Sequence, residues 1–256
     1  MTALKSILFG AAVGLASAGA VHAADFGPDQ PAPIYVTPPA YCWTGFYLGV
    51  TAGYANAFHS ADDLQGAFLG YPGLANNQSD GFAGGGTLGY NWQSGSLVYG
   101  LEADISWLTN KTTYVDPNGA INPFYPSATN RVNDLGTVRG RLGLAMDRTL
   151  IYVTAGLAYG DVANSLRYNS FGGSTGSTPS FSNDSTRFGW VVGSGVEYAL
   201  LPNWTVKGEA LFAELDSPTA SWVSPGSGTF PANAVYNERF NTSVAVVRGG
   251  LNYKFN

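Results

Sequence analysis

Residues 97–109 read LVYGLEADISWLT, which shows the alternation of the chain most clearly. Every second residue from Leu97 to Trp107 is apolar or aromatic. The positions between them include Glu102, Asp104 and Ser106. Strict alternation with a period of two is typical of a β-strand, not of a helix. The stretch therefore predicts a strand with one apolar face and one small, polar face that carries charge.

The same alternation recurs along the chain in seven further segments. They span residues 44–58, 82–93, 132–146, 151–159, 188–198, 204–212 and 245–255. In each segment one face carries aliphatic and aromatic side chains, and the other carries Gly, Thr and a few charges. The sequence therefore predicts an all-β protein with eight strands.

The connections between these segments alternate in length. Short links lie around residues 94–96, 147–148 and 201–203. The other links are long and rich in Gly, Ser, Asn and Pro, as in GGSTGS at 172–177. Short turns at one end and long loops at the other are typical of bacterial outer-membrane barrels. We therefore expect an eight-stranded antiparallel up-and-down transmembrane β-barrel, with short periplasmic turns and long extracellular loops.

The composition fits this class and excludes others. Only 11% of the residues are charged, against about 25% in an ordinary soluble domain. The net charge of −5 argues against a nucleic-acid partner. A soluble lipocalin-like barrel would hide its apolar face and show charge to water. Here the face with the aromatic residues is nearly free of charge, as contact with lipid requires.

The first 42 residues precede the alternating segments and have a different composition. Residues 1–23 read as an export signal, with Lys5 followed by an uncharged run and a small-residue cleavage site at Ala23. Residues 24–42 form a Pro-rich periplasmic linker that ends at the single Cys42. The barrel is expected to cover residues 43–256.

Eight charged residues fall on the polar faces of the predicted strands. They are Glu102, Asp104, Arg139, Arg141, Glu197, Lys207, Glu209 and Arg248. Four acidic and four basic residues balance, and burying unpaired charge costs several kcal/mol per ion. If the last short hairpin centres on Pro202, Glu197 faces Lys207 directly. We expect internal ion pairs that plug the lumen; the alternative is that some of these charges are solvated at the rims.

Aromatic residues of the apolar faces gather toward the two ends of the strands. The residues at the short-turn end are Trp43, Trp92, Tyr198, Trp204, Tyr253 and Phe255, and those toward the long-loop end are Trp107, Tyr159, Phe188 and Phe212. Amphipathic aromatic rings favour the two membrane–water interfaces. These residues are therefore predicted to form two aromatic girdles.

Both ends of the barrel sequence resemble those of a known family. Residues 43–50 read WTGFYLGV, residues 248–255 read RGGLNYKF, and Ala-Ala-Asp at 23–25 precedes the Pro-rich linker. Together they resemble the small outer-membrane β-barrel proteins of alphaproteobacteria, the porin-family or OmpA-like barrels. The resemblance implies an eight-stranded barrel whose Tyr-x-Phe ending is read by the outer-membrane assembly machinery. This chain adds Asn256 after that aromatic residue.

Motifs for catalysis or cofactor binding are weak. GGGTLG at 84–89 matches the dinucleotide fingerprint, but it lies inside an alternating strand and not between a strand and a helix. His59, the one histidine after the export signal, stands near Asp62 and Asp63 and reads as a solvated loop triplet. The acidic loop residues do not have EF-hand spacing. We expect no catalytic, cofactor or metal site, and no enzyme activity.

The function expected from these features is structural. The chain would be a surface-exposed barrel in the outer membrane of a Gram-negative bacterium, with a largely plugged lumen and loops for external contacts. Its expected partners are outer-membrane lipids, lipopolysaccharide and, through the C-terminal strand, the barrel assembly machinery; a monomer is favoured. Two alternatives are a narrow porin-type pore for small solutes and a haemin- or ligand-binding surface receptor. For the receptor, His59 and loop tyrosines are the only plausible iron ligands.

Overall fold

The computed structural model describes residues 41–63, 77–115, 124–170, 180–216, 219–223 and 232–255. The predicted export signal at 1–23 and nearly all of the linker at 24–42 lie outside these residues, as does the loop stretch at 172–177. Cys42, at the end of the linker, is an exposed free thiol.

The described residues form ten strands. They are β1 (Gly45–Asp63), β2 (Asn77–Ser94), β3 (Leu97–Leu108), β4 (Lys111–Val115), β5 (Phe124–Met146), β6 (Thr149–Ser170), β7 (Ser180–Ala199), β8 (Trp204–Leu215), β9 (Thr219–Val223) and β10 (Val235–Lys254). The two five-residue strands prolong their predecessors, because β4 pairs with β5 as β3 does and β9 pairs with β10 as β8 does. If β3 with β4 and β8 with β9 are each counted as one, the barrel wall consists of eight strands, which we call staves, as the sequence predicts.

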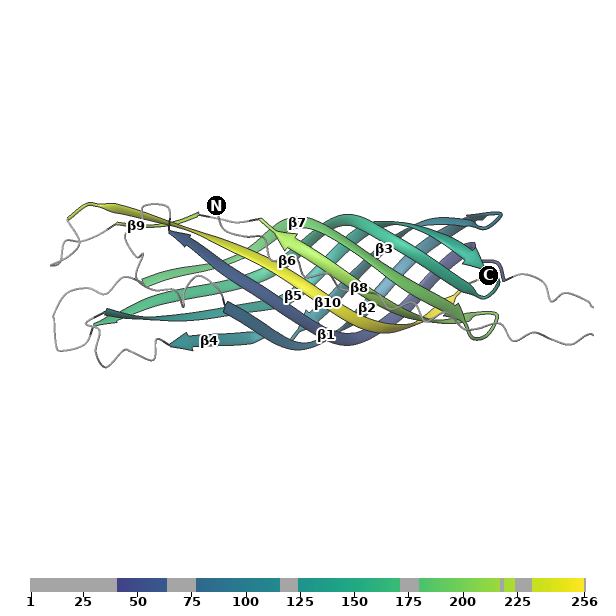
Figure 1. Cartoon of the computed structure of the whole chain (residues 1–256), viewed down its shortest axis with the longest axis horizontal. Coiled ribbons are helices and arrows are strands. Elements are labelled where there is room, and N and C mark those ends of the chain that lie inside the picture. Colours follow the sequence, from purple (N-terminus) through teal and green to yellow (C-terminus); the bar gives the residue numbers. More distant parts are fainter. Residues whose placement is uncertain are drawn as a thin grey trace, which may run out of the picture. The chain divides into compact units, whose positions relative to one another are not determined.

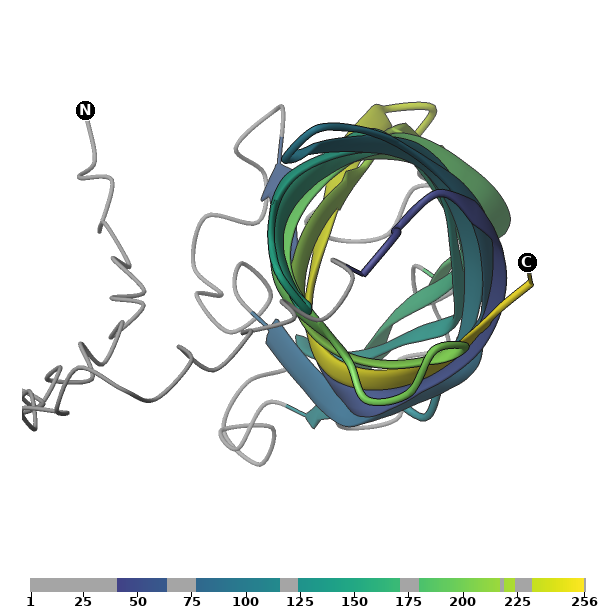
Figure 2. The same ribbon diagram turned by 90° about the vertical axis from the view of Figure 1, so that its right-hand side faces the viewer.

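Each stave pairs antiparallel with its neighbours, and the first pairs with the last. The ladder between β1 and β10 runs from Tyr47 opposite Lys254 to Asp63 opposite Glu238. Figure 1 shows the staves tilted across the long axis of the barrel, and Figure 2 shows the closed ring viewed from the short-turn end. Closure pairs the backbone groups of every stave, which a structure in lipid requires.

Burial along the strands follows the predicted alternation. In β8, exposed and buried residues alternate without interruption from Trp204 to Leu215. The exposed positions of β8 are apolar or Gly from Trp204 to Phe212, and the charged Glu214 follows at the end of the strand. Elsewhere on this face, Leu157 in β6 and Trp107 in β3 are 71% and 63% exposed. The face that the sequence assigns to lipid is therefore the outer face of the barrel. Among the described residues, no helix is long and apolar enough to cross a membrane.

Several strands extend further than the sequence predicts. β5 and β6 contain 23 and 22 residues, whereas about 9–11 residues cross a bilayer as a tilted strand. Their pairing continues past a bulge between Val132 and Asp134 up to Phe124 opposite Ser170. These extensions are polar and read as loop, but their backbone groups pair regardless of side-chain polarity. The hydrophobic pattern therefore marks the membrane crossing and not the whole strand.

The closed barrel should be slow to unfold in detergent. A barrel with paired edges should resist unfolding by sodium dodecyl sulfate at room temperature, because its barrier to unfolding is high. We expect the purified protein to migrate differently on a gel before and after boiling. Identical migration in the two lanes would contradict the closed barrel.

The outer face should tolerate charge only near its ends. Val138 lies midway along the outer face of β5, between Ala103 and Leu157 on the neighbouring strands, and is 57% exposed. V138R should lower the free energy of unfolding in lipid by about 2–4 kcal/mol. M146R, at the short turn on the same strand, is the control and should cost about 0–1 kcal/mol. Equal costs for the two variants would argue against lipid at Val138.

Candidate functional site

The interior of the barrel holds all eight charged residues that the sequence assigns to it. Glu102 and Asp104 come from β3, and Arg139 and Arg141 come from β5. Glu197 comes from β7, Lys207 and Glu209 from β8, and Arg248 from β10. Spacing of two residues along a strand places each pair on the same face. Every one of the eight is buried, with at most 8% of its surface exposed.

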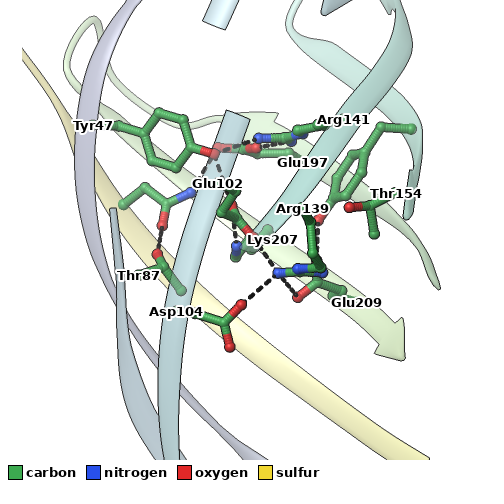
Figure 3. Close-up of polar contacts among 12 residues, drawn as sticks. Tyr47, Thr87, Glu102, Asp104, Arg139, Arg141, Thr154, Glu197, Lys207 and Glu209 are labelled. Carbon is green, nitrogen blue, oxygen red and sulfur yellow. Dashed lines mark hydrogen bonds and ion pairs between the residues drawn. The ribbon is translucent and has the colours of Figure 1, made fainter. Parts of the chain in front are cut away.

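Arg139 is the centre of this charge network. It is fully buried and forms ion pairs with three carboxylates. Its guanidinium nitrogens contact Glu102, lie 2.8 Å from Asp104 Oδ2 and lie 2.9 Å from Glu209 Oε1 (Figure 3). The planar guanidinium, with five N–H donors, suits several carboxylates at once.

Arg248 closes a ring with Arg139. Its Nη1 atom lies 2.8 Å from Asp104 Oδ1, and its Nη2 atom lies 2.7 Å from Glu209 Oε2. Asp104 and Glu209 are therefore each shared by the same two arginines. Arg248 Nη1 also donates to Ser106 Oγ at 3.0 Å. Two positive and two negative charges thus satisfy one another in the middle of the lumen.

The remaining charges join the ring from its short-turn side. Lys207 Nζ lies 2.8 Å from Glu102 Oε2, and the Tyr47 hydroxyl donates to the same oxygen at 2.7 Å. Arg141 pairs with Glu197, and its guanidinium lies 3.7 Å from the centre of the Tyr152 ring. These contacts complete the seven ion pairs of the described lumen.

Glu197 and Lys207 face each other on neighbouring strands, as the sequence predicts, but they do not form an ion pair with each other. The two residues are direct register partners on β7 and β8. Lys207, however, pairs with Glu102 on β3, which lies four staves away around the barrel. In a narrow closed barrel, facing walls are within reach of long side chains, so partners can come from opposite strands.

Glycines make room for the tyrosines that reach this network. A Cβ atom at Gly89 would lie 2.4 Å from the Tyr47 hydroxyl oxygen, and one at Gly195 would lie 2.5 Å from that of Tyr152. Gly89 ends the GGGTLG stretch at 84–89, which lies wholly within β2. Its strand context excludes the strand–turn–helix arrangement of a dinucleotide site.

Apolar side chains fill the lumen on both sides of the charges. At the short-turn end they form one group, the turn-end cluster, made of Trp43, Val98, Leu150, Tyr152 and Ala199. Beyond the charges lies a larger group, the apolar layer, made of Ala55, Ala57, Ala83, Leu108, Val132, Leu135, Ala158, Val162, Val191, Leu211, Ala213, Leu215, Val244 and Val246. The described lumen is thus stacked as apolar, charged and apolar layers.

The placement of Trp43 in an outer girdle is wrong. Trp43 is 1% exposed and packs edge-on against Tyr41, with ring centres 4.8 Å apart. Its backbone N–H donates to Gln93 Oε1 at 2.7 Å. Trp43 precedes the first strand residue, Gly45, so the alternation of β1 does not fix its direction. It belongs to the turn-end cluster inside the barrel.

The other residues predicted for the girdles lie on the outer face. Trp92, Trp204, Tyr253, Phe255 and Trp107 are all exposed. At the short-turn end the rings touch: Trp204 lies 5.1 Å from Tyr253, which lies 5.0 Å from Phe255.

The assignment of His59 to a solvated loop is also wrong. His59 lies in β1 and is 6% exposed. Its two ring nitrogens lie 3.4 Å from Thr242 Oγ1 and 3.3 Å from Ser79 Oγ. The polar residues around it belong to strands that continue past the lipid-facing segment, so their composition resembles that of a loop.

Two basic residues are missing from the predicted charge balance. Arg187 in β7 and Lys254 in β10 are buried on inward faces. The alternation around Phe188 already places Arg187 on the polar face, so the sequence contained this signal. Lys254 donates to the backbone carbonyl of Cys42 and lies 4.8 Å from the Tyr41 ring. The buried charges of the described residues are therefore four acidic and six basic.

These features define the class of protein. A closed barrel with an apolar outer face, exposed aromatic rings and a charge-paired interior is a transmembrane β-barrel. The described side chains of His, Cys, Asp and Glu contain no group of three or more that could hold a metal ion.

Comparison with known proteins gives the family. Residues 11–255 match the outer membrane protein beta-barrel domain, and the chain belongs to this family. It is therefore an outer-membrane protein of Gram-negative type.

Two relatives of similar sequence come from alphaproteobacteria. The 31 kDa outer-membrane immunogenic protein of Brucella melitensis is 32% identical over 263 residues, covering 98% of this chain and 100% of the relative. The 22 kDa outer membrane protein of Rhizobium leguminosarum is 31% identical, over 70% of this chain and 67% of the relative.

Among solved structures, the crystal structure of OprG from Pseudomonas aeruginosa is similar to this chain. The similarity covers 83% of this chain and 97% of the OprG chain, with 12% identity and a TM-score of 0.47.

The ion-pair network predicts a large effect for one truncation. R139A leaves three carboxylates in the lumen without their shared partner, and removing one member of a buried ion network costs about 3–5 kcal/mol. The midpoint of urea unfolding should fall accordingly. R148A, in an exposed turn, is the control and should leave the midpoint within error. An unchanged midpoint for R139A would contradict a stabilising network.

Proposed function

We propose that this protein is a structural, surface-exposed barrel whose lumen does not conduct. The observation that carries the proposal is that ion pairs join opposite walls. Glu102 on β3 pairs with Lys207 on β8, and Arg139 on β5 pairs with Glu209 on β8. Side chains that meet across the axis occupy the cross-section that a pore would need.

The layers on both sides of the network support the same proposal. Ions and polar solutes cross apolar constrictions poorly because these shed water. The apolar layer and the turn-end cluster would each form such a barrier. A solute would therefore meet two apolar segments and one set of mutually satisfied charges.

The alternatives have less support. A narrow pore needs hydrated polar groups along the lumen, and the lumen charges are engaged with one another. A haemin receptor that uses His59 needs this ring at the surface, and it is buried between Ser79 and Thr242. Enzyme activity has no supporting constellation among the described residues.

The expected partners follow from the two surfaces. The apolar outer face would contact the lipids and lipopolysaccharide of the outer membrane, with the barrel as a monomer. The C-terminal strand β10, ending near Tyr253 and Phe255, would be read by the barrel assembly machinery. Strand extensions such as those of β5 and β6, which continue past the length that crosses a bilayer, would offer contact sites outside the membrane.

Single-channel recording in planar bilayers tests the closed lumen. We expect the purified protein to insert without steady stepwise current. The double variant E102A/K207A should admit more current than the protein itself, because it removes one link between opposite walls. D147A/R148A, in the short turn after β5, is the matched control and should behave like the unchanged protein. Steady openings of the unchanged protein would contradict the proposal.

A further inference from the structure

A second set of polar residues lies inside the barrel, beyond the apolar layer. We call this set the upper polar ring, where upper means the end of the barrel away from the short turns. Its members are His59 on β1, Ser79 on β2, Asn110 between β3 and β4, Arg187 on β7 and Thr242 on β10. Each is at most 6% exposed. Each follows the inward residues of the apolar layer on its own strand or, for Asn110, just past the end of that strand, away from the short-turn end.

Arg187 carries a positive charge that no described acceptor compensates. In the described part of the chain, none of its three guanidinium nitrogens has a hydrogen-bond partner, and no carboxylate forms an ion pair with it. By contrast, Arg139, Arg141 and Arg248 each pair with at least one carboxylate.

The charge network cannot supply the missing anion. All four of its carboxylates already pair with the four cations of the network. The apolar layer, including Val191 on the same strand as Arg187, separates the two sets. A buried cation without compensation costs several kcal/mol, so the charge of Arg187 demands an anion from elsewhere.

The other members of the upper polar ring carry donors that suit an anion with several acceptor oxygens. Leu215 pairs with Gly189 on the strand of Arg187 and with Thr242 on the other side, and Thr242 pairs in turn with His59. Arg187 lies two residues along β7 from Gly189, and its burial places it on the inner face at the same end of the barrel. The side-chain amide of Asn110 has no partner among the described residues. Of the two hydroxyls that contact His59, on Ser79 and Thr242, the one that accepts from the ring N–H keeps its own O–H free to donate.

We propose that the upper polar ring is a binding site for a small oxyanion of the phosphate type, held by the guanidinium of Arg187. Arginine binds such groups through parallel N–H donors. The site lies inside the closed wall, so lipid headgroups on the outer face are separated from it, and a free ion is the expected ligand. This inference concerns a site apart from the charge network and does not depend on the proposed closed lumen.

The test measures stability against inorganic phosphate. Protein in detergent is unfolded at constant ionic strength while phosphate replaces gluconate. We expect the unfolding midpoint of the unchanged protein to rise and saturate, because a ligand that binds the folded state stabilises it. R187Q should show no saturable rise, whereas R148Q, in an exposed turn, should respond like the unchanged protein.

A second measurement separates binding from a structural role. Without phosphate, R187Q should be at least as stable as the unchanged protein, because it removes an uncompensated buried charge. A strong loss of stability for R187Q under these conditions would show that the guanidinium is already satisfied within the chain, and would overturn the proposal. An equal phosphate response in R187Q, or no response in the unchanged protein, would overturn it as well.

Discussion

Charges that point into a narrow barrel have neither lipid nor bulk water to solvate them, and the structure depends on how they find partners. Seven ion pairs solve this problem in the middle of the described lumen. Arg139 is shared by three carboxylates, and Asp104 and Glu209 are shared by two arginines. Because the partners come from β3, β5, β7, β8 and β10, the network links distant staves to one another.

Much of the fold could be predicted from the sequence because one physical constraint acts on every residue of a membrane strand. A side chain faces lipid or faces the lumen, so the alternation in residues such as those of β3 and β8 is nearly complete. The same alternation assigned all eight network residues to the inside, and the short hairpin gave the register of Glu197 and Lys207. Family membership follows from the match over residues 11–255.

The wrong predictions concern residues whose direction or partner is not fixed by the alternation between lipid and lumen. Trp43 precedes β1, so its direction depends on packing against Tyr41 and Gln93 and not on alternation. His59 lies on a strand extension, whose polar composition resembles a loop. Ion-pair partners such as Glu102 and Lys207 meet across the lumen, and no local pattern relates residues 105 positions apart in the chain. The alternation around Phe188 places Arg187 on an inward face, but that pattern says nothing of what balances its charge.

The layered interior separates two roles that a single polar lumen would combine. We propose that the charge network stabilises the barrel and blocks its lumen, whereas the upper polar ring lies beyond the apolar layer and carries a cation without a described partner. A double-mutant cycle between Glu102 and Lys207 measures whether charges on opposite staves stabilise each other. The free energy of unfolding is measured for the unchanged protein, E102A, K207A and the double variant. We expect the two single effects not to add, with a coupling of about 0.5–3 kcal/mol. Additive effects would show that the two charges do not interact.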